Sequence, residues 1–212
     1  VSQERIILNE SSLWSGSPQD ADKSDAATYL PEIRRLLLEG KNAEAEKLVY
    51  AHFTCKGKGS GRGSGKDVPY GSYQTLGDLK IDFPGGGDVA GYRRELDLES
   101  AIARVEYEQS GTKYLRQTFV SAPDQVIVVR LSANKSRSIS FSASLDRPER
   151  FTVTGDGRSG LLMSGRLNNG TDGKGMKYAL RLRALNNGGT IAVNGNSLVV
   201  KDADEVVLLL TA

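Results

Sequence analysis

The residues that most resemble a reactive loop are the glycines and basic side chains between Cys55 and Asp67. Glycine occupies every second position from Gly57 to Gly65, with lysine, serine and arginine in between. A dinucleotide fingerprint needs glycines at i, i+2 and i+5, and a Walker A loop needs glycines five residues apart before Lys-Ser or Lys-Thr. Alternation provides only even spacings, and Lys66 is followed by Asp67. The run therefore matches neither nucleotide motif and predicts a solvated basic loop.

The chain has a single cysteine, Cys55, and a single histidine, His52. One cysteine allows no internal disulfide, and the two residues make no zinc site unless carboxylates supply the other ligands. A histidine-centred catalytic triad would have to use His52, which lies on a helical pattern. We therefore expect neither a metal nor a cofactor.

Trp14, the single tryptophan, lies in the polar, turn-rich segment LNESSLWSGSP. The segment suits sugar stacking, because a pyranose packs its apolar face on an aromatic ring. Packing at the end of a core is the other interpretation, and the residues leave both open. Asn9, Glu10 and Asp78 are polar candidates, and a glycosidase needs two carboxyl groups about 5–5.5 Å apart for retention or about 6.5–9.5 Å apart for inversion. With 26 acidic residues, the sequence singles out no such pair.

A helical pattern covers the stretch TYLPEIRRLLLEGKNAEAEKLVYAHF. Pro31 suits a first helical position, Gly40 the position after a helix end, and Asn42 the cap of a second helix. The pair resembles one tetratricopeptide unit, but an array needs at least about three units, so we reject a repeat protein. We expect a helical insertion over about 26–54, followed by a Gly-rich loop over 56–72.

After Tyr73 the pattern changes to short, often alternating segments separated by turn signals such as PGGGD, QSGT and NNGG. Roughly a dozen strand candidates with tight turns indicate an antiparallel β-sandwich. The predicted fold class is mainly β: a large antiparallel β-sandwich, or supersandwich, with an inserted helical pair near the N-terminus. We expect a single β-sandwich domain over residues 1–212, as a fragment of a longer chain.

The charge balance is unremarkable, with a formal net charge of +2 and 25% charged residues. This balance favours neither a nucleic acid nor an anionic membrane as a partner. The longest apolar run, VVLLL at 206–210, is typical of a buried strand and is far shorter than the roughly 20 residues of a membrane span. We therefore expect no nucleic-acid partner and no membrane span.

Six segments carry a resemblance to a known family. In chain order they are ERIILNESSLWSGSP, LPEIRRLLLEGKNAEAEKL, YGSYQTLGDLKIDF, YRRELDLESAIARVEY, QTFVSAPDQVIVVRLSA and SFSASLDRP. Together they resemble the N-terminal domain of glycoside hydrolase family 95, the α-L-fucosidase family, which also includes some α-L-galactosidases. The resemblance covers nearly the whole chain, although the glycine-rich NGRLG-type strand that usually precedes the first segment has no counterpart here.

The resemblance implies an N-terminal β-supersandwich, a helical linker, an (α/α)6 catalytic barrel and a C-terminal β domain. It also implies hydrolysis of terminal α-1,2-linked L-fucose, or a related sugar, with inversion. The catalytic residues of that family lie on the barrel, and none has a matching position here, so we expect this fragment alone to be inactive. The implied setting is bacterial glycan degradation in the periplasm or outside the cell.

We expect the domain to buttress the downstream barrel of the same chain and to lend loops to the rim of its pocket. Fucosylated or related glycans would then be bound through the full-length enzyme. A free-standing carbohydrate-binding β-sandwich module is an alternative, and a polyanion binder acting through Lys56–Lys66 is a third hypothesis. The rim residues expected from the segments most diagnostic of the family are Asn9, Glu10, Trp14, Gln74 and Asp78.

Overall fold

A computed structural model describes residues 1–18, 22–53 and 71–212, which form two compact units. The sandwich unit comprises Val1–Leu13, Gln74–Leu167 and Met176–Ala212, and the second unit comprises Trp14–Tyr73 and Asn168–Gly175. The expectation of a single domain over residues 1–212 stays a prediction. Most of the Gly-rich loop predicted over 56–72 lies outside the described residues, and this includes the basic run Lys56–Lys66.

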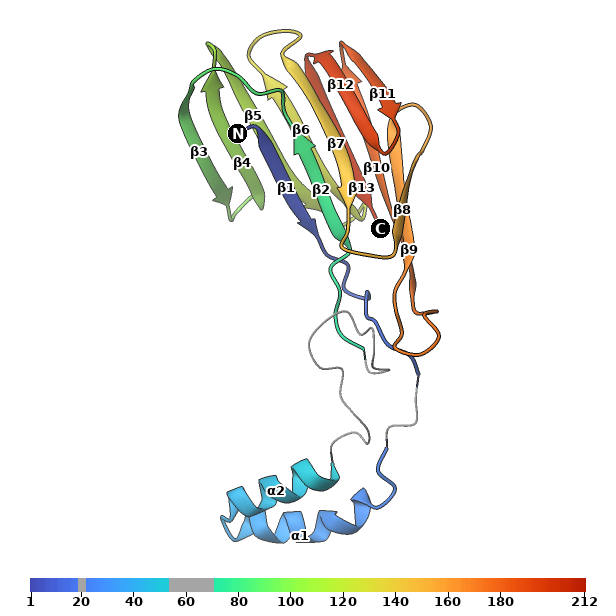
Figure 1. Cartoon of the computed structure of the whole chain (residues 1–212). Coiled ribbons are helices and arrows are strands. Elements are labelled where there is room, and N and C mark those ends of the chain that lie inside the picture. The colour runs from blue at the N-terminus through green and yellow to red at the C-terminus, as the bar shows by residue number, and fades with distance from the viewer. Residues whose placement is uncertain (19–21, 54–70) are drawn as a thin grey trace. The chain divides into compact units, whose positions relative to one another are not determined.

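The strands of the sandwich unit form two antiparallel sheets, which confirms the predicted mainly β class (Figure 1). The smaller sheet has five strands in the order β1-β2-β7-β12-β11, and the larger has eight in the order β3-β4-β5-β6-β13-β10-β9-β8. The strands are β1 (Gln3–Leu8), β2 (Gly77–Asp82), β3 (Val89–Asp97), β4 (Ile102–Gln109), β5 (Thr112–Ser121), β6 (Val126–Ala133), β7 (Ile139–Asp146), β8 (Phe151–Gly155), β9 (Gly160–Arg166), β10 (Lys177–Asn187), β11 (Thr190–Asn194), β12 (Ser197–Ala203) and β13 (Glu205–Thr211).

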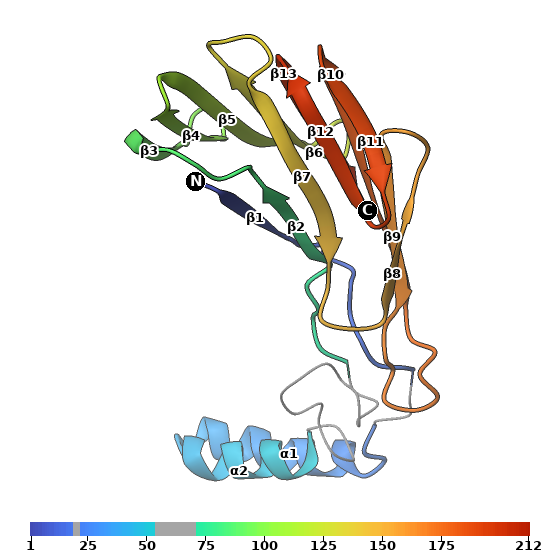
Figure 2. The same cartoon turned by 45° about the horizontal axis from the view of Figure 1, so that its top comes forward.

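The core lies between the two sheets, which are stacked as layers (Figure 2). Strand β7 shows why its sequence folds this way, because apolar and polar residues alternate along ISFSASLD. Ile139, Phe141, Ala143 and Leu145 enter the core, and the serines between them face away. A strand of period two buries one face and hydrates the other, so this pattern fixes the register of the strand against its neighbours.

Strand β3 forms one edge of the larger sheet and is irregular. Its register against β4 shifts between Ala90 and Arg93, and Gly91 between them has a φ of +60°. Glycine reaches this left-handed conformation without steric cost. The shift is a β-bulge, which bends the edge and interrupts its row of regular pairing.

The helical pair consists of α1 (Ala26–Leu38) and α2 (Asn42–His52). Gly40 follows α1 with a φ of +73°, and its N–H donates to the Leu37 carbonyl at 3.1 Å. The Lys41 N–H donates to the Leu36 carbonyl at 2.9 Å. These two bonds form a Schellman motif, which confirms the predicted role of Gly40 at the helix end.

Two predictions about the helix starts are wrong. Helix α1 begins at Ala26, so Pro31 lies inside the helix and not at its first position. The preceding turn accounts for the early start, because the Ala26 N–H donates to the Lys23 carbonyl at 3.1 Å. Asn42 is the first residue of α2 and Lys41 occupies the cap, without a side-chain cap bond.

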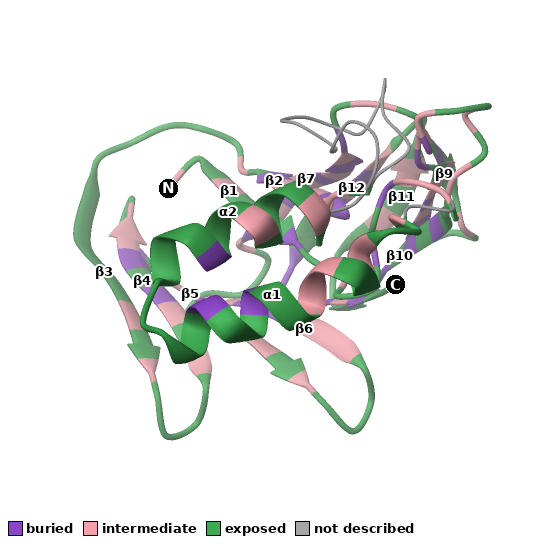
Figure 3. Cartoon of the chain, turned by 90° about the horizontal axis from the view of Figure 1, so that it is seen from below, coloured by how far each residue is buried: buried purple, intermediate pink, exposed green. Residues whose placement is uncertain are grey.

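The two helices share a small core of their own. Ile33, Leu36 and Ala45 are buried between them, and Figure 3 shows the buried positions on the facing sides of α1 and α2. The Tyr29 and His52 rings close one end of the pair, stacked with centroids 3.4 Å apart. Neither α1 nor α2, the helices of the described ranges, has the length and apolar character needed to cross a membrane.

Candidate functional site

Two exposed aromatic rings meet in the second unit. Trp14 and Tyr73 form an isolated antiparallel bridge, and their rings lie edge to face, with centroids 5.8 Å apart and an interplanar angle of 66°. The Trp14 residue is 52% exposed and Tyr73 is 42% exposed. The structure therefore places Trp14 at the surface of its unit, which favours the stacking interpretation over packing in a core.

The neighbouring residues fix the positions of the two rings. The Ser15 N–H donates to the Ser72 carbonyl at 3.0 Å, and the Ser72 N–H donates to Ser15 Oγ at the same distance. A Cβ at Gly71 would lie 1.8 Å from the Ser15 carbonyl oxygen, so only glycine allows this approach. The sequence GSY at 71–73 thus holds Tyr73 beside Trp14 through backbone geometry.

The loop 168–175 belongs to the same unit and presents a carboxylate. Asn169 is buried, and its Oδ1 accepts the N–H of Gly173 at 2.9 Å while its Nδ2 donates to Asp172 Oδ1 at 2.9 Å. The Lys174 N–H also donates to Asp172 Oδ1, and these donors hold the pKa of Asp172 below its ordinary value. Asp172 is therefore an ionised hydrogen-bond acceptor at neutral pH.

The same loop is tied to the tryptophan segment. The Gly16 N–H donates to the Asn168 carbonyl at 3.5 Å. The second unit thus combines two exposed rings with a fixed carboxylate, and aromatic surface with a few placed polar groups is typical of small-ligand sites. Tyr73, Asn169 and Asp172 are missing from the residues predicted as site candidates. Their signal was present in YGSYQTLGD and in NNGTDGKG, but the second segment was interpreted only as a turn.

Four of the five predicted rim residues belong to the sandwich unit, whereas Trp14 belongs to the second unit. Glu10 closes a turn, because its carboxylate accepts the Ser12 N–H at 2.9 Å and the Ser12 hydroxyl at 2.5 Å. The Gln74 N–H donates to the Leu13 carbonyl at 2.9 Å, and Asn9 lies exposed between β1 and that turn. That these residues contact a sugar stays a prediction.

Asp78, the fifth rim candidate, lies on β2 within a ladder of ion pairs. Its carboxylate is 2.8 Å from Arg5 Nη2, and its register partner on β7 is Asp146. Lys80 Nζ lies 2.5 Å from Asp146 Oδ2, and this hydrogen bond is the main cause of the lowered pKa of Asp146. A general acid needs a raised pKa, so Asp146, whose pKa is lowered, is unsuited to acid catalysis, and Asp78 lies in an ion pair with Arg5.

The Lys80–Asp146 pair predicts a dependence of stability on pH. A carboxyl whose pKa is lowered by folding contributes stability that is present above its unfolded pKa, about 3.9, and is lost as the pH falls through the lower folded value. We expect Asp146→Asn to unfold at a lower urea concentration than the unsubstituted chain at pH 6, with the difference closing as the pH falls below about 4. Urea titrations at stepped pH measure this, and a difference that stayed constant down to pH 2.5 would contradict it.

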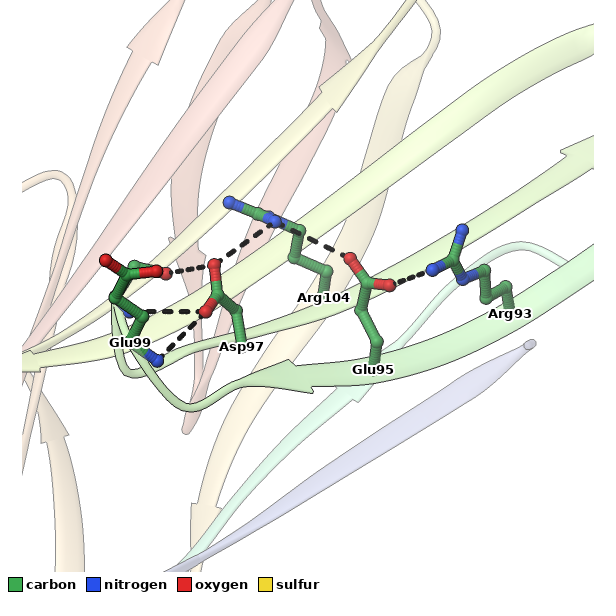
Figure 4. Close-up of polar contacts among 6 residues, drawn as sticks. Arg93, Glu95, Asp97, Glu99 and Arg104 are labelled. Atoms are coloured by element: carbon green, nitrogen blue, oxygen red, sulfur yellow. Dashed lines mark hydrogen bonds and ion pairs between the residues drawn. The ribbon is translucent and has the colours of Figure 1, made fainter.

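A second group of charged residues borders the larger sheet (Figure 4). Asp97 accepts the Ser100 hydroxyl at 2.7 Å and the Glu99 N–H at 3.0 Å. These hydrogen bonds lower the pKa of Asp97, and the bond from the Ser100 hydroxyl has the largest effect. Arg104 Nη1 lies 3.5 Å from Glu95 and 4.0 Å from Asp97. These contacts order the turn after β3.

In the described parts of the chain, histidine, cysteine and acidic side chains form no group of three that could hold a metal ion.

A comparison with known protein families matches the whole chain to one family. A family model described as "Glycosyl hydrolase family 65, N-terminal domain" matches residues 1–212. The chain belongs to this family. The number 65 differs from the family 95 resemblance of the six sequence segments, but both agree on the N-terminal domain of a glycoside hydrolase. The prediction of a glycoside hydrolase N-terminal domain is therefore confirmed.

The chain is also similar in sequence to curated proteins that are named as fucosidases. It is 35% identical to Alpha-L-fucosidase 2 of Arabidopsis thaliana over 235 aligned residues, which cover 100% of this chain and 26% of that protein. It is 33% identical over 141 residues to Probable alpha-fucosidase A of Aspergillus niger, covering 63% of this chain and 16% of the relative. The domain thus spans about a quarter of the length of these relatives or less. They are plant and fungal proteins, and the bacterial source expected from the sequence stays a prediction.

Proposed function

We propose that this chain is the non-catalytic N-terminal domain of an inverting α-L-fucosidase of family 95. In this proposal the domain buttresses an (α/α)6 catalytic barrel that follows it in the same polypeptide. The observation that carries the proposal is the alignment of the entire chain with about a quarter of a relative named as an α-L-fucosidase. The carboxylates of the described residues fit this role, since those with a resolved pKa shift have lowered values, whereas a glycosidase acid needs a raised one.

The aromatic pair supplies the domain's own contribution to substrate binding. Trp14 and Tyr73 expose ring surface within a segment that carries the family resemblance, LNESSLWSGSP, and its companion YGSYQTLGD. An apolar sugar face packs on such rings, and a carboxylate of the same unit, Asp172, can accept hydrogen bonds from sugar hydroxyls. We infer that this part of the domain lines the rim of the barrel's pocket and contacts fucosylated or related glycans.

The proposal predicts a division of activity between the domain and the longer protein. We expect the full-length protein to release L-fucose from α-1,2-fucosylated oligosaccharides, with the β-anomer appearing first in proton NMR spectra because the reaction inverts the anomeric centre. We expect the 212-residue chain to release none. Hydrolysis by the isolated chain, or the absence of any α-fucosidase activity in the full-length protein, would overturn the proposal.

A free-standing carbohydrate-binding module is the second candidate, and the exposed Trp14–Tyr73 pair is the observation that favours it. Isothermal titration calorimetry of the 212-residue chain with fucosylated oligosaccharides distinguishes the two candidates. A module binds glycans alone, whereas a rim that needs the barrel to complete its site binds them only in the longer protein. For either candidate we propose a setting in the periplasm or outside the cell, where glycans of this class are met.

A further inference from the structure

Strand β13 is apolar on both of its faces. Val206, Leu208 and Leu210 enter the core, while Val207 and Leu209 point away from it and remain partly exposed. Strands that are apolar on both sides are typical of sheets covered on both faces. In the sandwich unit the smaller sheet covers only the inner side of β13. The apolar side chains on its outer side therefore remain available for contact with another layer of protein.

The register of the larger sheet extends this apolar surface across several strands. Leu209 pairs with Val128 on β6, and Val128 pairs with Phe119 on β5. On the other side, Val207 pairs with Leu185 on β10, which is 51% exposed. We call these five residues, Phe119, Val128, Leu185, Val207 and Leu209, the outer strip. They are neighbours by register on four strands, with Arg130 and Arg183 at the adjoining positions.

The outer face of the smaller sheet has the opposite character. The outward positions of β7 are Ser140, Ser142 and Ser144, followed by Asp146 in its ion pair with Lys80. Along β7 the outer face of the smaller sheet is therefore polar, whereas the outer strip of the larger sheet is apolar. A contiguous apolar surface that is left partly open and is bordered by charge is typical of an interaction surface.

The charges around the outer strip indicate what chemistry its partner offers. Arg130 and Arg181 already have acidic partners, Glu205 at 2.6 Å and Asp156 at 2.8 Å. Arg183, the register partner of Leu209, is exposed and has no acidic partner among the described residues. A partner surface with apolar side chains and a carboxylate opposite Arg183 fits this arrangement. A second copy fits less well, because it would bring another Arg183 to the strip.

We propose that the outer strip is the surface on which the catalytic region of the longer polypeptide docks, with an acidic residue of that region paired to Arg183. This inference rests on the proposed function, since it requires the longer polypeptide. The relatives support the size of such a region, because this chain corresponds to only 26% of Alpha-L-fucosidase 2. Docking would cover both faces of β13 and pair the free guanidinium.

The test places a thiol on each outer face of the sandwich. Val128→Cys labels the outer strip, and Val199→Cys on β12 is the matched control, since Val199 is a partly exposed valine on the outer face of the smaller sheet. Both are made in a Cys55→Ser background, and modification by a maleimide is timed in the 212-residue chain and in the full-length protein. We expect the Val128→Cys thiol to react at least about tenfold more slowly in the full-length protein, because interface residues are reached only through transient opening. The Val199→Cys thiol should react at equal rates in both.

Three results would overturn the proposal. Equal rates for the Val128→Cys thiol in both proteins would mean that the outer strip is not covered. Slow labelling of the short chain that becomes faster on dilution would mean that a second copy covers it. Slow labelling of the short chain at every concentration would mean that another part of this chain covers it. Thiol labelling is independent of fucoside hydrolysis, so a full-length protein with no activity on α-fucosides would refute the proposed function and leave the docking result interpretable.

Discussion

Replacing Arg116 with alanine should lower the free energy of unfolding of the sandwich unit by about 3–5 kcal/mol. Arg116 is only 5% exposed, and its guanidinium carbon lies 3.8 Å from the centre of the Phe83 ring. Its Nη2 donates to the Tyr107 hydroxyl at 2.8 Å, and its Nη1 lies 3.4 Å from Glu4. Alanine would remove the stem that fills this space and leave the Glu4 carboxylate without its cation. Urea denaturation followed by circular dichroism measures the change.

Two further variants separate packing from charge at this position. Arg116→Met keeps an unbranched stem beside Phe83, so we expect it to cost less than alanine, because apolar replacements of similar volume are tolerated better than a vacancy. Arg158→Ala, at an exposed turn, should change stability by no more than about 0.5 kcal/mol. If Arg116→Ala unfolded at the same urea concentration as Arg158→Ala, the buried arginine would have no structural role.

Replacing Trp14 with alanine in the full-length protein should lower kcat/KM for α-1,2-fucosylated oligosaccharides by about 10- to 100-fold, because burying an aromatic face against an apolar sugar face is worth about 1.5–3 kcal/mol. The melting temperature should change little, since Trp14 is 52% exposed and is not a member of the two buried clusters found among the described residues. Initial-rate kinetics and differential scanning calorimetry give the two quantities.

The control for this variant is an aromatic residue of similar exposure outside the proposed rim. Tyr92 on β3 is 50% exposed, and Tyr92→Ala should leave kcat/KM unchanged. Trp14→Phe should recover most of the lost activity, because a smaller ring still offers a stacking face. An unchanged kcat/KM in Trp14→Ala, together with a fall in melting temperature, would make Trp14 structural.

The sequence predicted the fold wherever side-chain alternation was strict. Strand β7 is such a case, and its serines mark the hydrated side without ambiguity. The end of α1 was equally clear, because the glycine at position 40 adopts the left-handed backbone there without steric cost. The start of α1 was missed because proline at a first helical position is only a statistical preference, and Pro31 lies inside α1, where it has no N–H to donate to the preceding turn.

Strand β5 shows what alternation leaves undetermined. In KYLRQTFVS, both sets of alternate residues contain apolar and polar members. In the structure Arg116 points inward, where its guanidinium packs on the Phe83 and Tyr107 rings, and Phe119 points outward. The site candidates were limited in the same way. The pairing of Trp14 with Tyr73 joins residues 59 positions apart, and no spacing rule for a single segment reports such a contact.

The bulged edge at β3 affects how readily the domain aggregates. A flat, regular edge strand offers open backbone groups to the edge of any other molecule and so promotes ordered aggregation. At β3 the shift at Gly91 breaks that regularity, and the charged side chains of Arg93, Glu95 and Asp97, at every second position, oppose close approach by a second strand. The edge thus limits strand-to-strand association of this domain with a second copy while both are newly made and concentrated.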